Sequence, residues 1–291
     1  MSKITCKNHP EKEAVKVCVS CQSNLCEECI NIQSISKDVT IESCKECGGR
    51  CKDIEGEVEG KKEGVSKISF FSLLPSAFTY PFNGSGKLLL VIGVVFFGLM
   101  DLLGSLPFGW VFGIFGSGYL IAYMFKIVNS SAIGKNEMPD WPDVSDFGSD
   151  IIGPLWAMFL TTVVSFGPAV ICLILISKNP VFLIAAIAFG VLGIIYYPMA
   201  IIATALDTNL FVRPDVILVS IFKVIGPYIV ACLLLAAIIV GNKLLGAVLI
   251  KISPIVGFIT AYSLAFYFII VEMRILGLIY YTNSERLGWF E

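Results

Sequence analysis

Residues 6–47 read CKNHPEKEAVKVCVSCQSNLCEECINIQSISKDVTIESCKEC, and this segment sets the organisation of the whole chain. It contains four pairs of Cys or His residues, and two residues separate the members of each pair: Cys6 and His9, Cys18 and Cys21, Cys26 and Cys29, Cys44 and Cys47. A two-residue spacer lets one tight turn direct two ligands to one ion, and structural zinc takes four such ligands. The pattern therefore predicts two Zn²⁺ ions, each bound by two pairs.

The pairing of these ligands has two alternatives. In the interleaved arrangement, which we favour, the first and third pairs bind one ion and the second and fourth pairs bind the other; sequential pairing is the alternative. A disulfide framework would need an oxidising compartment and would give His9, the only histidine, no role. Cys51 is expected to be an unliganded surface cysteine, with replacement of Cys47 as the alternative.

The composition divides the chain into a small polar domain and a membrane domain. Overall, 56% of residues are hydrophobic and 15% are charged, which is too apolar for a soluble domain. The predicted boundaries are a zinc domain over residues 1–51, a charged, glycine-rich linker over 52–66, and a membrane domain over 67–291. Because the zinc domain is too small for a self-sufficient core, metal should supply much of its folding free energy. The near-neutral net charge of −2 argues against nucleic-acid binding.

The fold class expected for the second part is an all-α polytopic membrane domain. Hydrophobic runs of spanning length predict six transmembrane helices, with five as the alternative. The runs cover residues 87–105, 109–128, 151–177, 181–206, 224–245 and 254–280. The aromatic segment 68–82 is too short to span and is expected to lie in the bilayer interface.

Two loops suggest an internal repeat of helical hairpins preceded by interfacial helices. Pro142-Asp143-Val144 followed by Gly153-Pro154 resembles Pro214-Asp215-Val216 followed by Gly226-Pro227, about 73 residues later. Chance similarity among apolar helices is the alternative. Three copies of the repeat would make up the domain, with residues 68–128 as a degenerate first copy. In the second copy, helical spacing of Trp141, Val144, Phe147 and Ile151 predicts an amphipathic helix whose aromatic face contacts lipid.

Orientation follows from the thiols and from the charge pattern. Zinc thiolates need a reducing compartment, so the N-terminus is expected in the cytosol, and six spans return the C-terminus to the same side. The predicted outer loops contain few basic residues, as the positive-inside rule requires: Lys178, Lys243 and Lys251. The sequence thus predicts a multi-pass protein of the cell membrane.

The segment CKNHPEKEAVKVCVSCQSNLCEEC, followed by CKEC, resembles the B-box zinc finger. The resemblance implies a cross-braced two-zinc module that serves as a protein-interaction surface, although Cys44 and Cys47 stand where animal B-boxes usually have histidines. NEMPDWPDVSDFGSDIIGP and MRILGLIYYTNSERLGWF look like a prokaryotic membrane domain of unknown function (family 4013) and, more weakly, the Yip trafficking family. That second resemblance implies an integral membrane domain without a known reaction.

Few ionisable residues lie within the predicted spans, and these are the candidate site residues of the membrane domain: Asp101, Glu272 and Arg274. Intramembrane charges often have a function. Glu272 and Arg274 are two residues apart and should point to different faces of one helix. An interfacial position, a buried pairing with another helix, and a transport pathway are the three interpretations.

The sequence assembles no catalytic constellation, so an enzyme is not expected. A membrane-anchored protein-interaction adaptor or membrane-organising protein is the favoured function. Its partners would be a protein bound by the zinc module and the bilayer, with homo-oligomerisation left open. The alternatives are a transporter or channel regulated by the zinc module, and a zinc-responsive sensor.

Overall fold

A computed structural model describes residues 5–18, 21–36, 39–46, 51–53, 69–104, 106–142, 148–206 and 213–289. The chain forms two compact units, Met1–Ile68 with Gly288–Glu291, and Ser69–Leu287. The predicted linker, residues 52–66, lies almost entirely outside the described residues. Each unit is treated below by itself.

The N-terminal unit is built from short antiparallel strands and one helical turn. Its elements are β1 (Lys16–Cys18), β2 (Asn24–Leu25), the 3-10 helix η1 (Glu27–Cys29), β3 (Ile30–Ser36), β4 (Val39–Cys44) and β5 (Cys51–Asp53). β1 lies between β2 and β5, and β3 pairs with β4. Short strands suit this segment because its turns are fixed by the Cys-x-x-Cys spacers.

The core of this unit consists mainly of cysteines. Among the side chains that the structure describes, the buried cluster contains few aliphatic residues, and its members are Cys6, Cys18, Leu25, Cys26, Cys29, Ile30 and Cys44. Cys51 in β5 is half-buried and packs against this cluster, since Cys51 is the register partner of Cys18. Cys51 is therefore less exposed than predicted, and its unliganded state stays a prediction.

The second unit is helical. Its elements are α1 (Phe70–Thr79), the 3-10 helix η2 (Tyr80–Phe82), α2 (Gly86–Gly104), α3 (Trp110–Ala132), the π-helix η3 (Gly148–Ile152), α4 (Gly153–Leu175), α5 (Val181–Leu206), α6 (Pro214–Lys223), α7 (Ile225–Ile252) and α8 (Pro254–Leu287). Six of the described helices are long and apolar enough to cross a membrane, which agrees with the predicted six rather than five: α2, α3, α4, α5, α7 and α8.

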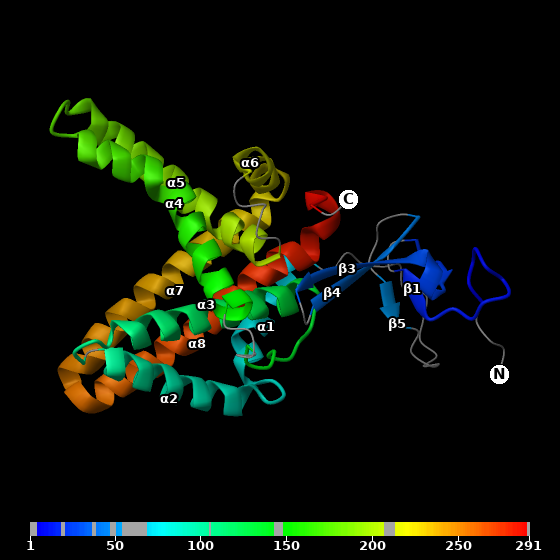
Figure 1. Ribbon diagram of the computed structural model, residues 1–291, viewed down its shortest axis with the longest axis horizontal. Helices are drawn as coiled ribbons and strands as arrows, with labels where there is room; N and C mark the ends of the chain where they lie inside the picture. The colour runs from blue at the N-terminus through cyan, green and yellow to red at the C-terminus, as the bar shows by residue number, and fades with distance from the viewer. Residues whose placement is uncertain are drawn as a thin grey trace. The chain divides into compact units, whose positions relative to one another are not determined.

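These six helices form three consecutive hairpins. Figure 1 shows α4 and α5 side by side, diverging from the α7–α8 hairpin, while α3 packs along α8. Gly277 of α8 allows α8 to pack closely against α3, because a Cβ at this position would come within 2.3 Å of Ser131 Cβ on α3. Large aliphatic side chains such as Ile184 and Leu233 are exposed on the outer faces, as expected for helices surrounded by lipid.

The segment that follows α3 differs from the prediction. Trp141 is not helical; it stacks on Tyr123, with ring centroids 4.6 Å apart, and on Tyr119, at 5.9 Å. The prediction that Trp141 belongs to an amphipathic helix is therefore wrong, because the half-buried indole packs on the aromatic surface of α3 instead. Ile151, predicted on the same face, is fully buried in η3, and residues 143–147 lie outside the described part.

The second loop of the suggested repeat agrees with the predicted local structure. α6 begins at Pro214, where the ring's fixed φ suits a first helical position, and Asp215 lies in the positively polarised first turn. α7 begins at Ile225, next to Gly226-Pro227. The repeat itself stays a prediction, as does the interfacial position of α1 and η2.

Candidate metal centre

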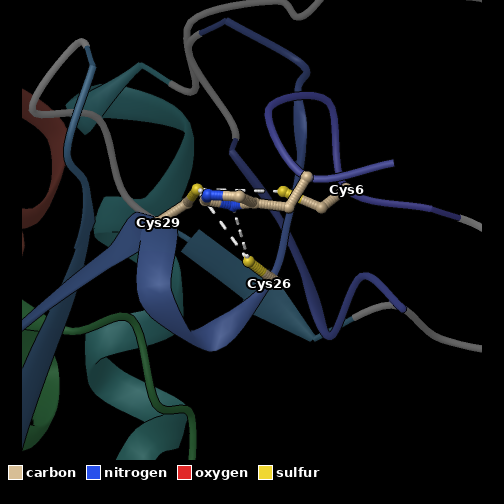
Figure 2. A group of neighbouring side chains, drawn as sticks. Cys6, Cys26 and Cys29 are labelled. Atoms are coloured by element: carbon tan, nitrogen blue, oxygen red, sulfur yellow. Dashed lines mark hydrogen bonds between the residues drawn. The ribbon is translucent and has the colours of Figure 1, made fainter. Parts of the chain in front are cut away.

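The first and third Cys/His pairs meet in one four-residue cluster. The ligand atoms of Cys6, His9, Cys26 and Cys29 all lie within 4.8 Å of one another. Figure 2 shows the thiols of Cys6, Cys26 and Cys29 pointing toward one another, with Cys6 from one segment and Cys26 and Cys29 from a single turn of another. Three of the four residues are buried, and His9 is half-buried.

The spacing of these atoms fits a tetrahedral zinc shell. The Sγ atom of Cys29 lies 3.8 Å from that of Cys6 and 3.9 Å from that of Cys26. With Zn–S bonds of about 2.3 Å, tetrahedral geometry places two sulfur atoms about 3.8 Å apart. His9 Nδ1 lies 3.4 Å from the Sγ atoms of both Cys26 and Cys29, close to the roughly 3.5 Å of a tetrahedral N–S edge. A disulfide would instead need about 2.05 Å.

Local backbone structure creates this cluster. Cys26 and Cys29 flank the turn of η1, where the Cys29 N–H donates to the Cys26 carbonyl at 3.0 Å. At the other pair, Cys6 N–H donates to the Lys12 carbonyl at 3.0 Å and closes a loop around His9. Each two-residue spacer thus becomes a tight turn, as the sequence pattern predicts.

The second cluster contains Cys18, Cys21 and Cys44, whose sulfur atoms also lie within 4.8 Å of one another. The Sγ atoms of Cys21 and Cys44 are 3.9 Å apart. Gln22, in the turn after Cys21, has a φ of 55°, and its N–H donates to the Cys18 carbonyl at 2.9 Å. Cys47, the predicted fourth ligand, lies outside the described residues.

Shared strands connect the two clusters. Ile30, which follows Cys29, is the register partner of Cys44 on β4, and the Lys45 N–H donates to the Cys29 carbonyl at 3.1 Å. Ligands that are far apart in sequence therefore come together in alternating order, pairs one and three in one cluster and pair two with Cys44 in the other. This grouping is the one expected for interleaved rather than sequential ligation.

The first cluster holds thiols with opposed pKa shifts. Burial opposes ionisation of Cys6, but the backbone N–H groups of Cys26, Asn8 and His9 outweigh it and lower the Cys6 pKa to about 6. Burial raises the pKa of Cys29 to about 11, and the neighbouring Cys6 and Cys26 sulfur atoms add to the shift. Crowded sulfur atoms thus resist simultaneous ionisation, and a divalent cation would relieve that repulsion.

Polar residues beside the cluster were not identified from the sequence. Asn8 Nδ2 lies 4.0 Å from Cys29 Sγ and donates to Glu46 Oε1 at 3.1 Å, while Lys7 pairs with Glu46 at 3.2 Å. The Lys7 and Asn8 contacts to Glu46 connect the first cluster with the turn after Cys44. Asn8 lies between the two residues of the first pair, and Glu46 lies between the two residues of the fourth pair. Their place in these spacers could have pointed to them from the sequence.

The membrane-domain candidates do not assemble into one site. Arg274 is 2% exposed, Glu272 is half-buried, and the side chain of Asp101 on α2 lies outside the described part. Among the described residues Glu272 and Arg274 form no salt bridge with each other, in line with their two-residue spacing. Arg274 instead donates to the carbonyl of Lys135 and, at 2.8 Å, to Oδ1 of Asn136.

Comparison with known proteins supports the metal assignment. Residues 1–34 match the family model described as B-box zinc finger. Neither the curated proteins nor the solved structures contain a match to the chain. The protein therefore carries a zinc-finger module of the B-box type together with six candidate membrane-spanning helices.

Proposed function

We propose that this protein is a membrane-anchored adaptor whose zinc module binds a partner protein. The observation that supports it most is that two clusters of metal-ligating side chains, in a B-box-type segment, belong to the same chain as six candidate spans. Complete ligand shells leave no open position for a substrate, which favours a structural over a catalytic metal.

Each zinc ion has a defined ligand set in this proposal. Cys6, His9, Cys26 and Cys29 hold one ion, and Cys18, Cys21, Cys44 and Cys47 hold the other. The result is a cross-braced module in which metal replaces the missing aliphatic core. Permanent structural zinc would also make a zinc-responsive sensor a poor fit.

The membrane domain would hold this module at the cytosolic face of the cell membrane, with both termini in the cytosol. The reducing cytosol keeps the thiols available for zinc. The resemblance to the domain of unknown function (family 4013), and more weakly to the Yip family, implies only an integral membrane domain. A membrane-organising role is a further part of this proposal.

Proximity labelling with the full-length protein tests the adaptor function. A labelling enzyme fused to the N-terminus should mark a defined set of neighbours, and Cys26→Ser should remove that set. Cys232→Ser, a cysteine in α7 outside both clusters, is the matched control and should keep it. Identical labelling by all three proteins would overturn the proposal.

A transporter or channel regulated by the zinc module is the second candidate. The observation that favours it is the non-helical segment from Lys135 to Pro142, which runs back along α3: Tyr123 Oη donates to the Pro139 carbonyl, and Tyr119 Oη to the Pro142 carbonyl at 3.0 Å. Non-helical backbone at membrane depth is tolerated where it is covered by protein or lines a water-filled cavity. Flux that disappears in Glu272→Gln would support this function, and unchanged flux would oppose a path through Glu272.

A further inference from the structure

The end of α3 and the adjoining part of α8 enclose a group of buried polar atoms without partners. Among the described residues, these include Nε of Arg274 and the hydroxyls of Ser130 and Ser131. The exposed fractions are 2% for Arg274, 4% for Ser130 and 0% for Ser131. Such groups are normally paired, because each unpaired buried polar group costs about 1–3 kcal/mol.

Several elements bring these residues together around the Tyr80 ring. The guanidinium carbon of Arg274 lies 4.5 Å from the Tyr80 ring centroid. The hydroxyls of Ser130 and Ser131 lie beside the Tyr80 phenol. Gly277, one turn after Arg274, packs directly against Ser131. Tyr80 itself is held by a hydrogen bond to the Glu137 carbonyl at 3.1 Å.

The charge of this group is unbalanced. The two Nη atoms of Arg274 contact neutral acceptors, and no carboxylate of the described residues lies within salt-bridge distance of the guanidinium. A buried cation normally pairs with an anion, since desolvation of an unpaired charge is expensive. The unpaired atoms that surround Tyr80 are an N–H donor and two hydroxyls, which are groups that bind the oxygen atoms of an oxyanion; Oδ1 of Asn129, an acceptor, and Nε1 of Trp141 are the other unpaired buried atoms of the described residues.

The depth of Arg274 along α8 suggests where such an anion is found. Arg274 lies twenty residues after Pro254, the first residue of α8. At about 1.5 Å per residue this is roughly 30 Å, the thickness of a bilayer's hydrocarbon core. A helix that enters the hydrocarbon core at Pro254 would therefore reach the level of the opposite phosphate headgroups near Arg274.

We propose that Arg274, Ser130 and Ser131 form a binding site for a phosphate-class oxyanion, supplied by a lipid headgroup or by inorganic phosphate. The proposal is independent of the zinc module and of the adaptor function. In this site the Arg274 Nε–H and the two serine hydroxyls donate to phosphate oxygens, and the Tyr80 ring covers the guanidinium.

Thermal unfolding of the full-length protein in dodecyl maltoside, a detergent without phosphate, tests the site. The probes are phosphatidylglycerol, inorganic phosphate, and chloride at equal ionic strength. At saturation a single bound ligand should raise the unfolding temperature by about 3 °C. Stabilisation by phosphatidylglycerol alone identifies a lipid headgroup, and stabilisation by both phosphate probes shows that the phosphate group suffices.

The Ser130→Ala/Ser131→Ala double variant should lose this phosphate-dependent shift. It should still fold, because the substitutions remove hydroxyls that make no hydrogen bond within the described protein. The matched control is Thr260→Ala/Ser263→Ala on α8, whose hydroxyls bond to carbonyls of their own helix, and it should keep the shift. No stabilisation of the wild-type protein by either phosphate probe, or an equal shift in both double variants, would overturn the proposal.

Discussion

The zinc module and the membrane domain differ in what they bury. Among the described side chains of the module, the buried cluster consists mostly of cysteines. In the membrane domain, large aliphatic residues such as Ile202 and Ile275 are buried between helices together with small and polar residues such as Ala203 and Thr204, and many other large aliphatic residues are exposed. We therefore expect the module to depend on metal bonds and the membrane domain on close helix packing.

The largest effect should come from removing one zinc ligand. Cys26→Ala leaves the first cluster with three ligands, and structural zinc contributes about 10–16 kcal/mol in small domains. We expect the module to lose its resistance to proteolysis, while the membrane domain keeps its helical circular dichroism signal.

Cys172→Ala in α4 is the control for this experiment, because Cys172 lies outside both clusters. It should leave proteolysis of the module unchanged. Equal protease resistance of Cys26→Ala and wild-type protein would contradict the view that metal holds the module together.

Acidification should weaken zinc binding by the module without affecting the membrane domain. Zinc binds thiolates, and the pKa of about 11 for Cys29 means that its proton must be displaced at neutral pH. Each displaced proton lowers zinc affinity about tenfold for each unit of pH decrease. The slope should steepen below pH 6, where Cys6 also becomes protonated. Competition titrations with a chromophoric chelator measure this slope, and an affinity independent of pH would contradict the assignment.

A smaller effect is expected from overpacking the membrane domain. The Cβ of Gly277→Ala would meet Ser131 Cβ at 2.3 Å and the Val128 carbonyl oxygen at 2.7 Å. Separating α3 from α8 should lower the free energy of unfolding by about 1–3 kcal/mol. Unfolding in detergent, followed by circular dichroism, measures it.

Gly241→Ala on α7 is the matched control, since a Cβ there meets nothing within 4 Å. It should be neutral or stabilising by about 0.5–1 kcal/mol. If both glycine variants behave alike, close packing at Gly277 is not what holds α3 against α8.

The smallest effect should come from the hydroxyl pair between α4 and α5. Thr161 and Thr204 are buried, and their hydroxyls lie 2.8 Å apart. Interhelical hydrogen bonds of this type contribute about 0.6 kcal/mol on average. A double-mutant cycle with Thr161→Val and Thr204→Val should give a coupling free energy of that size. A coupling free energy indistinguishable from zero would show that this hydrogen bond does not stabilise the α4–α5 contact.

The same contrast explains how much the sequence could predict. The Cys-x-x-Cys spacers specify tight turns, so the four residues of the first cluster and the three of the second could be named in advance, with their interleaved grouping as the favoured alternative. Hydropathy likewise predicted six spans, because crossing a bilayer requires length and apolar composition. Both patterns are local and follow directly from the chemistry of single segments.

Features that depend on contacts between distant segments could not be predicted. Trp141 was expected to face lipid because its spacing from Val144 and Phe147 is helical. That spacing contains no information about the aromatic surface that Tyr123 and Tyr119 provide. Ser130 and Ser131 carry no motif, and their burial against Tyr80 depends on how η2 meets α3 and α8. The partial burial of Cys51 depends on the pairing of β5 with β1, which the sequence does not reveal.

The zinc content of the purified full-length protein, measured by native mass spectrometry, tests the central claim most directly. We expect two zinc ions per chain, one ion in Cys6→Ser, and one ion in Cys18→Ser. A wild-type protein that folds and holds no zinc, or variants that keep both ions, would contradict the assignment of two metal sites to the module.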